Sequence, residues 1–480
     1  MEHLELNTYA EVYDSYDPGK ATLADLTRHH QEEIQAEVPS DSLRTARESP
    51  ELHSTSPNAL VNEAHLAPVD RGFSAWAMLV ASCIVELFVW GFPNSSGVLL
   101  AAYLKDPVYS SQKHATSILP LVGTLCTGIM YCLGLVIYPS MHYYPRLRRV
   151  YTWSGTTICF LSLLGASFTR NVTSLIILQG VSFAVGGSLV YPPVISYMSE
   201  WFVQRRGLAN GILVAGDNTG GVLFPIIIPA LISRFGIMVT TRIYAIALAV
   251  CLLPALPFMK ARLPESRVHG PAPRSNTRSW VRESRFWFFI TINTLQGFAH
   301  FVPLTWLPTF ATALGLTTGQ ASLTLTLVNA ASIFAGFGMG WLSDRYNVRV
   351  LAILSLLLTS FATFVLLAYG VAYGSTAGCW SSMWNGFVRP VAKDDPSLAT
   401  TMFSFLLLSR GVGNILSTPI STALQHAKLA IAQSGSTPKT GFAVDSGRYD
   451  AVIIYAGTCF AGAAVVAALG WSLDKKRNAN

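Results

Sequence analysis

The chain has 480 residues, of which 51% are hydrophobic and only 12% are charged. A soluble domain carries about 25% charged residues, so this composition excludes an ordinary soluble protein and is typical of an integral membrane protein. The net charge is +7, but the residues up to position 70 hold 14 acidic and 4 basic side chains, and the rest hold 12 and 29. The positive charge therefore belongs to loops beside a bilayer, and no nucleic-acid partner is implied.

Residues 1–70 are acidic and polar, and they contain no apolar run long enough for a signal peptide. This composition predicts a disordered cytoplasmic tail. The chain's seven cysteines all lie further along, in apolar segments without a CxxC pair. They are expected to pack as small hydrophobes, so we expect no metal site and no cofactor.

From Phe73 onward, apolar stretches of about 20 residues recur, which is the length that crosses a bilayer. They predict twelve transmembrane helices. The expected spans are 73–97, 115–138, 150–168, 173–197, 208–232, 237–259, 286–310, 320–342, 348–368, 371–391, 398–423 and 450–472.

Lys and Arg residues in the connections predict the orientation. With the N-terminus inside, the even-numbered connections and the C-terminal tail carry 19 of them, and the odd-numbered connections carry 8. Both termini are therefore expected in the cytoplasm. The basic segment 260–285, rich in Pro and Ser, predicts a linker between a six-helix bundle at 71–259 and a second one at 286–473, followed by a cytoplasmic tail at 474–480.

The stretch Trp201–Gly221, which leads into the fifth span, contains the paired cations Arg205 and Arg206, followed by small residues four apart. This spacing places small side chains on one helical face, where another helix can approach closely. The residues expected to pack in this way are Gly211, Ala215, Gly216 and Gly220. Asp217 and Asn218 stand in the middle of the same helix, so we expect that region to border a polar interior.

Gly340–Arg349, which reads GWLSDRYNVR, resembles the G-x-L-[ST]-D-R-x-x-x-R loop of the major facilitator superfamily. The resemblance implies that this loop clamps neighbouring helix ends while a carrier faces outward. The residues expected to gate the conformational change are Arg205, Arg206, Asp344, Arg345 and Arg349. The equivalent stretch of the first half, 139–150, keeps its arginines but has no acid. We therefore expect the corresponding clamp between helix ends in the first half to be weaker or to use Glu200 as its acid.

Two further stretches resemble motifs of the monocarboxylate porter family within that superfamily: Asp70–Trp76 (DRGFSAW) at the start of the first helix, and the fifth-span motif Trp201–Gly220. The phrase RGVGNILSTPIS, residues 410–421, looks most like the fungal branch. Two departures argue against proton–lactate symport by the animal scheme. Asn94 stands where animal lactate carriers place a lysine, and the eighth span carries no charge.

Polar residues inside the spans are the candidate ligands, because charge in lipid is costly and marks functional paths. Arg410 lies about 18 Å deep in the eleventh span and is a candidate fork for a carboxylate, or else an ion-pair partner of Glu86 or Asp217. Both acids are candidate proton carriers or structural groups, and His300 is a proton relay or a wall residue. The full candidate set is Arg410, Glu86, Asn94, Asp217, Asn218, His300, Gln296 and Asn329.

These patterns predict an all-α membrane protein with two pseudo-symmetric six-helix bundles around a central cavity, the major facilitator fold, working by alternating access. The expected function is secondary transport of a small, carboxylate-bearing organic solute. Efflux of a fungal secondary metabolite is favoured over uptake of a monocarboxylate or a vitamin-like metabolite, with protons as a candidate coupling ion. A membrane enzyme is disfavoured because no nucleophile–base set is visible, and a non-transporting sensor remains an alternative. We expect residence in the plasma membrane.

Overall fold

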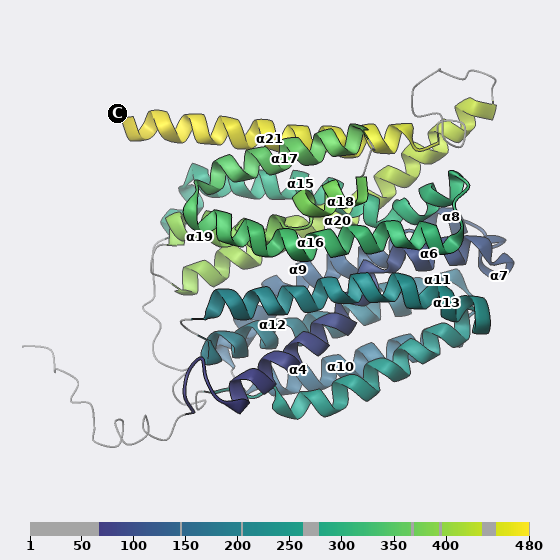
Figure 1. The fold of residues 1–480 in the computed structure, drawn as a ribbon, viewed down its shortest axis with the longest axis horizontal. Helices are drawn as coiled ribbons and strands as arrows, with labels where there is room; N and C mark the ends of the chain where they lie inside the picture. Colours follow the sequence, from purple (N-terminus) through teal and green to yellow (C-terminus); the bar gives the residue numbers. More distant parts are fainter. Residues whose placement is uncertain are drawn as a thin grey trace, which may run out of the picture. The chain divides into compact units, whose positions relative to one another are not determined.

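Every regular element in the described residues is a helix (Figure 1). The computed structural model describes residues 67–144, 146–202, 205–262, 278–365, 369–392, 396–433 and 448–479. The expected acidic tail lies outside these residues except for its last four positions, and so does most of the expected linker. We refer to residues 67–262 as the N-half and to residues 278–479 as the C-half.

The first expected span is three helices in sequence rather than one. α4 (Phe73–Val89) ends at Trp90, α5 (Gly91–Asn94) is a single turn, and α6 (Ser96–Lys105) continues beyond the expected end at residue 97. The rest of the N-half is α7 (Pro107–Ser110), α8 (Ala115–Ile118), α9 (Leu121–Tyr143), α10 (Leu147–Ala166), α11 (Val172–Leu175), the π-helix η2 (Ile176–Ser182), α12 (Phe183–Trp201), α13 (Arg206–Ala255) and η3 (Leu256–Phe258).

Helix α13 contains the expected fifth and sixth spans, which meet at Gly236. The backbone there has φ of 76°, a conformation that favours glycine because it has no Cβ. The turn therefore divides the 50 residues of α13 into two helical segments, close to the boundary expected between 232 and 237.

The C-half is also helical, and its tenth expected span is broken. The elements are η4 (Arg278–Arg282), α15 (Ser284–Ala313), α16 (Thr318–Arg345), α17 (Val348–Val365), α18 (Tyr369–Ala377), η5 (Trp380–Met383), α19 (Trp384–Ala392), α20 (Pro396–Gln433) and α21 (Asp450–Ala479). A reciprocal capping box between Thr317 and Gln320 fixes the start of α16. α21 continues as a helix through most of the expected tail.

Within the described residues, five helical stretches are long and apolar enough to cross a bilayer. They are Ala115–Met141, Val172–Trp201, Leu208–Phe258, Thr318–Ser343 and Asp450–Lys476. The third has 51 residues, about 75 Å of helix, which is enough for two passes through a hydrocarbon core of about 30 Å. The division into twelve spans in two bundles stays a prediction.

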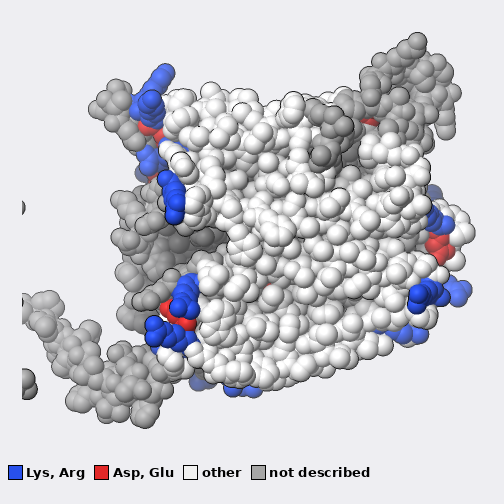
Figure 2. Space-filling view, in the orientation of Figure 1, with Lys and Arg blue, Asp and Glu red and all other residues white. Residues whose placement is uncertain are grey.

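The surface separates charged from apolar side chains. In Figure 2, coloured Lys, Arg, Asp and Glu side chains gather at the left and right edges, and a broad uncharged band lies between them. Large apolar side chains such as Phe334, Phe361 and Val250 are exposed. A surface of this kind suits contact with lipid, which cannot solvate charge.

The charged side chains lie at two opposite ends of the molecule (Figure 2). The basic face is the end where α4 begins, where the C-terminus lies, and where the ion pairs Arg148–Glu200 and Arg349–Asp474 are found. The opposite face is the end that carries Lys105 and α7 (Figure 1).

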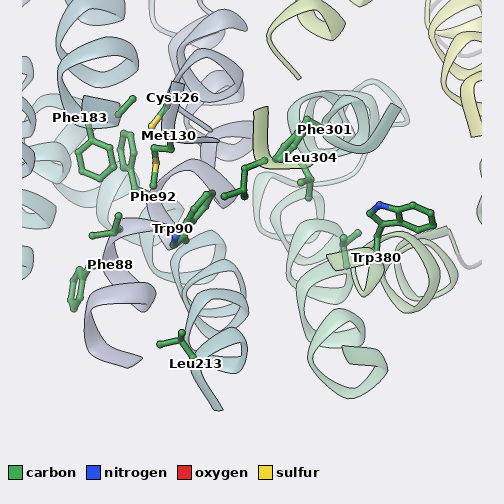
Figure 3. Packing of buried hydrophobic residues seen from close by; sticks show 14 of the residues in the cluster. Phe88, Trp90, Phe92, Cys126, Met130, Phe183, Leu213, Phe301, Leu304 and Trp380 are labelled. Atoms are coloured by element: carbon green, nitrogen blue, oxygen red, sulfur yellow. The ribbon is translucent and has the colours of Figure 1, made fainter. Parts of the chain in front are cut away.

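The core contains residues from both halves. Figure 3 shows Phe88, Trp90 and Phe92 beside buried N-half residues such as Phe183, with Phe301 and Leu304 of the C-half across from them. Between the halves, α9 packs against α20, α13 against α16, and α6 against α15. The first span therefore packs against α13 through α4 and α5, and it packs against α15 through α6, after the break at Ser95.

Candidate functional site

Arg410 on α20 is a buried charge without a carboxylate partner among the described residues. Its side chain is 4% exposed, and its Nη1 donates a hydrogen bond of 2.6 Å to Oε1 of Gln296 on α15. Its Nε has no hydrogen-bond partner. Neither Glu86 nor Asp217 forms an ion pair with it in the described part of the chain. The described residues therefore contain no ion pair between Arg410 and Glu86 or Asp217, which was the structural alternative expected for Arg410.

Aromatic rings surround the Arg410 guanidinium. Its central carbon lies 5.8 Å from the ring centre of Tyr131, 5.7 Å from that of Phe301 and 5.9 Å from that of Trp384. These distances allow cation–π attraction, which is strongest where water is excluded. The charge is thus held by one amide oxygen and three ring faces, which come from α9, α15 and α19.

Trp90 extends this group of rings into the N-half. Its ring centre lies 5.0 Å from that of Tyr131 and 5.4 Å from that of Tyr191 on α12. Tyr131 in turn lies 6.2 Å from Phe301 across the two halves. We call Trp90, Tyr131, Tyr191, Phe301 and Trp384 the aromatic cluster.

The two predicted acids lie on the N-half side of this cluster. Asp217 on α13 is half-buried, and its Oδ1 accepts a 2.7 Å hydrogen bond from Nδ2 of Asn94 on α5. Glu86 on α4 is buried, and its Oε1 has no hydrogen-bond partner. Electrostatic interactions couple Asp217 to both Glu86 and Arg410. Asp217 is thus the residue that links the predicted group, by its hydrogen bond to Asn94 and by its charge toward Glu86 and toward Arg410 across the interface between the halves.

Gln296 belongs to this group because it binds Arg410, and its Nε2 has no partner. His300 lies one turn further along α15 and stacks on Tyr373 of α18, with ring centres 6.2 Å apart. Its Nδ1 is buried without a partner.

The other two predicted amides bind their own helices. Asn218 donates to the Val214 carbonyl oxygen, and Asn329 donates to that of Leu325. The structure therefore does not join these two side chains to Arg410 by hydrogen bonds.

The aromatic cluster is the part of the site that sequence reasoning missed. None of its five rings is among the residues that the sequence marks as candidate ligands, because an apolar or amphipathic ring inside a span is not unusual by itself. Trp384 stands near the middle of the span expected at 371–391, and Trp90 stands one turn beyond Glu86. Their position deep inside the spans is the sequence feature that could have pointed to them. Depth alone, however, does not show which rings lie around Arg410.

The small-residue face of α13 packs against the first span. A Cβ at Gly216 would lie 2.6 Å from Sγ of Cys83, and one at Gly220 would collide with Leu87 and Gly91. Gly211 instead faces Phe337 of α16, and the Ala215 carbonyl accepts from Thr219. Asp217 therefore lies on α13 between Gly216 and Gly220, the two positions where this helix approaches the first span most closely.

At the basic face of the N-half, the two motif stretches meet. Oδ1 of Asp70 accepts a 2.8 Å hydrogen bond from the Arg205 backbone N–H, and the Asp70 N–H donates to the Trp201 carbonyl oxygen. Glu200 forms a buried ion pair with Arg148 and also accepts from the Arg262 N–H. Arg148 of the N-half stretch therefore has Glu200 as its acidic partner, and whether this pair acts as a latch stays a prediction.

The C-half has its own ionic group at this face. Arg349 pairs with Asp474 of α21 at 2.6 Å, and Arg285 reaches the same carboxylate oxygen at 3.2 Å. The Arg345 guanidinium lies over the Trp341 ring, 4.0 Å from its centre. Asp474 was missed because the sequence placed it in the tail. The side chains of Arg206 and Asp344 lie outside the described residues.

Side-chain hydrogen bonds between the halves lie toward the opposite face in the described ranges. Nδ2 of Asn414 on α20 donates to the Thr124 carbonyl and to the Thr127 hydroxyl of α9. Thr418 donates to the Thr124 hydroxyl at 2.7 Å, and Lys105 donates to Thr318 at 3.2 Å. These contacts hold the two halves together on the side away from the basic face.

A cavity of about 720 Å³ opens between α6, α13 and α16 at the opposite face. Its walls are mostly apolar, and Lys105 and Asp106 stand at its rim. None of the predicted solute-binding residues lines it. It is therefore separate from the site around Arg410.

Comparisons with known proteins agree with this architecture. The family model of the Major Facilitator Superfamily matches residues 87–418, more than half of the chain. The MFS transporter asaE of Aspergillus flavus is 26% identical over 422 residues, covering 85% of this chain and 91% of its own. The Fujikurins efflux protein of Gibberella fujikuroi is 24% identical over 445 residues, covering 87% and 91%.

Solved structures share the fold at low sequence identity. A bacterial homologue of the lysosomal transporter Spinster, crystallised in an inward-facing and unoccupied conformation, matches with a TM-score of 0.59 and 14% identity over 83% of this chain and 97% of its own. The nucleoside transporter NupG matches with a TM-score of 0.60 and 15% identity, covering 82% and 99%. The chain therefore belongs to the Major Facilitator Superfamily and is a multi-pass membrane transporter of small-molecule solutes.

Proposed function

We propose that this transporter exports a small organic anion, a carboxylate-bearing fungal secondary metabolite, across the plasma membrane. The two motif stretches, Asp70–Trp76 and Trp201–Gly220, support placement in the fungal branch of the monocarboxylate porter family. The efflux protein of Gibberella fujikuroi, named for fujikurins, supports export at 24% identity. The basic face would be cytoplasmic, with both termini there, because positively charged loops remain on that side.

Arg410 carries the proposal. A buried guanidinium without an acidic partner is costly, and intramembrane charges of this kind mark solute paths. Its planar fork suits a carboxylate, and its Nε is free to donate. An anionic solute would supply the missing counter-charge, with Gln296 orienting the guanidinium from the other side.

Transport would follow from movement of the two six-helix bundles about this site. The Asn414–Thr124 and Lys105–Thr318 contacts would break when the opposite face opens. Arg205, Arg206, Asp344, Arg345 and Arg349 would then form the contacts that hold the basic face closed, while Glu200 and Asp474 keep each half rigid. Gly216 and Gly220 would let α13 move with the first span as one body, whereas Gly211 and Ala215 would be small positions where α13 faces its other neighbours.

Proton coupling is part of the proposal, with Glu86, Asp217 and His300 as the groups that would exchange protons. Glu86 and His300 each hold a buried polar atom without a partner, and Asp217 keeps some exposed area. Collapsing the pH gradient across proteoliposomes should lower the solute flux. An unchanged flux would remove these three residues from the coupling mechanism.

Comparative metabolite profiling of cells and medium, with and without the protein, tests the direction of transport. Export predicts that one acidic product accumulates inside the deletion strain and disappears from the medium. Loss of uptake of an external acid would instead indicate an uptake permease for a monocarboxylate or a vitamin-like metabolite. Solute binding without any flux in vesicles would indicate a sensor.

Arg410→Ala should reproduce the deletion phenotype while the protein remains in the membrane. Arg170→Ala provides the control, because Arg170 is an exposed arginine near the opposite face. Normal export by the Arg410 variant would contradict the assignment of the binding site.

A further inference from the structure

We propose that the solute held by Arg410 carries a flat, unsaturated ring system with oxygen acceptors beside its anionic group. This inference rests on the proposed function and adds to it the class of solute. An oxygenated aromatic carboxylate or enolate fits the description, whereas an aliphatic acid of similar size does not.

The first line of support is the aromatic cluster itself. Phe301 and Trp384 border Arg410 from the C-half, Tyr131 borders it from the N-half, and Trp90 lies next to Tyr131. Tyr131 and Tyr191 are half-buried, so part of each ring is not covered by protein. Ring faces arranged around an anion site favour stacking with a second flat π-system over contact with a flexible chain.

The second line of support is a set of buried donors without partners. They are Nε1 of Trp90, Nε1 of Trp384, Nε2 of Gln296 and Nε of Arg410. Each side chain is less than 8% exposed. Buried polar groups are normally hydrogen-bonded, so a concentration of unpaired donors in one place indicates a missing acceptor.

Other tryptophans in the described residues show that this chain can satisfy buried indoles. Trp306 donates to Ser421, Trp380 to Asn293, and Trp201 to the Lys260 carbonyl oxygen. Trp90 and Trp384 differ from these, and both belong to the cluster around Arg410. The lack of an acceptor for a buried indole N–H is therefore a feature of this site and not of the fold in general.

Together the two observations define the solute. A carboxylate or enolate would accept from Nε of Arg410 and Nε2 of Gln296. Carbonyl or phenolic oxygens on the ring would accept from the two indoles. On the acidic side, Oε1 of Glu86 is free to accept a hydrogen bond from a hydroxyl of the solute.

Binding of three matched acids to the purified full-length protein tests the inference. The probes are naphthoate, hydroxynaphthoate and the saturated decahydronaphthoate, which share the carboxylate and a fused two-ring skeleton. We expect naphthoate to bind about tenfold more tightly than the saturated acid, because only naphthoate can stack. Hydroxynaphthoate should bind more tightly still, because its hydroxyl oxygen meets an unpaired donor.

Trp90→Phe and Trp384→Phe keep an aromatic ring but remove the indole N–H. At least one of them should abolish the advantage of hydroxynaphthoate over naphthoate. Trp471→Phe, on the outer surface of α21, is the control and should leave all three affinities unchanged. Monodisperse elution and unchanged melting temperatures would establish that the variants are folded.

The outcomes separate this inference from the proposed function. Equal affinity for aromatic and saturated acids, lost together in Arg410→Ala, would overturn the ring preference and leave the anion site standing. Aromatic binding that survives Arg410→Ala would overturn the anion site instead. A hydroxyl advantage that persists in both tryptophan variants would overturn the donor assignment.

Discussion

Arg148 and Glu200 form an ion pair that is largely removed from solvent, with side chains 7% and 9% exposed. Removing one partner of such a pair leaves an uncompensated buried charge. Glu200→Gln should therefore lower the free energy of unfolding by about 3 kcal/mol. Chemical denaturation of the purified protein in detergent measures this change.

Glu283→Gln is the matched control, since Glu283 faces Arg285 at 3.7 Å in a pair with more than 20% exposure on each side. Exposed pairs contribute roughly 0–1 kcal/mol, so this substitution should have little effect. Equal losses in the two variants would contradict the view that burial gives the Glu200 pair its importance.

Individual residues of the site differ in how far the sequence could reveal them. Arg410, Glu86 and Asp217 stand out because a charge in an apolar span needs a reason to be there. The roles of Trp90 and Trp384 could not be read in the same way, because an indole in a span carries no sign of whether its N–H finds an acceptor. Asn218 and Asn329 are amides inside spans, which makes them candidate ligands by residue type alone, but each donates to a backbone carbonyl of its own helix, and this orientation is not visible in the sequence.

Helix α13 owes its position to glycines that allow close contact with the first span. Gly216→Val should force α4 away from α13, because even a Cβ there would lie 2.6 Å from Sγ of Cys83. Overpacking of this kind costs about 1–3 kcal/mol. The melting temperature of the purified protein should fall accordingly.

Gly462→Val on α21 is the control for this substitution, because no atom lies within 4 Å of a Cβ built there. It should fold and melt like the wild type. A Gly216 variant as stable as the Gly462 variant would mean that the α4–α13 contact is looser than described.

Helix positions followed from the sequence more readily than helix breaks did. Apolar stretches of bilayer length located most of the helices, since hydropathy is set by composition alone. The breaks at Trp90 and Ser95 were not visible, because the apolar run continues across them. The turn at Gly236 could be placed because a short polar break at Ser233–Arg234 and a glycine interrupt the pattern.

The molecule as a whole is held together near the opposite face by a small polar network. Asn414, fully buried on α20, binds Thr124 and Thr127 of α9. Asn414→Leu would leave those groups without their amide partner and weaken the contact between the halves. We expect the equilibrium to move toward conformations open at the opposite face.

Distance distributions between spin labels on α9 and α20 at that face measure this shift. The long-distance population should increase in Asn414→Leu. Thr157→Val serves as a control, because Thr157 is exposed and bonds only within α10. Identical distributions in wild type and Asn414→Leu would show that these hydrogen bonds do not govern closure.

The arrangement of the halves could be anticipated only through family resemblance. Hydropathy predicts helices, but it does not state which helices meet across the interface. The pairing of α9 with α20 and of α13 with α16 depends on complementary shape. At Gly221 of α13, for example, the missing side chain leaves room for Asn329 of α16. Such complementarity becomes visible only in three dimensions.

The central claim is that an organic anion crosses the membrane by binding Arg410. Flux of radiolabelled hydroxynaphthoate into proteoliposomes of wild type, Arg410→Ala and Arg170→Ala tests it most directly. The account predicts saturable flux for wild type and Arg170→Ala, and background flux for a folded, correctly inserted Arg410→Ala. Saturable flux of wild-type size through Arg410→Ala would contradict it.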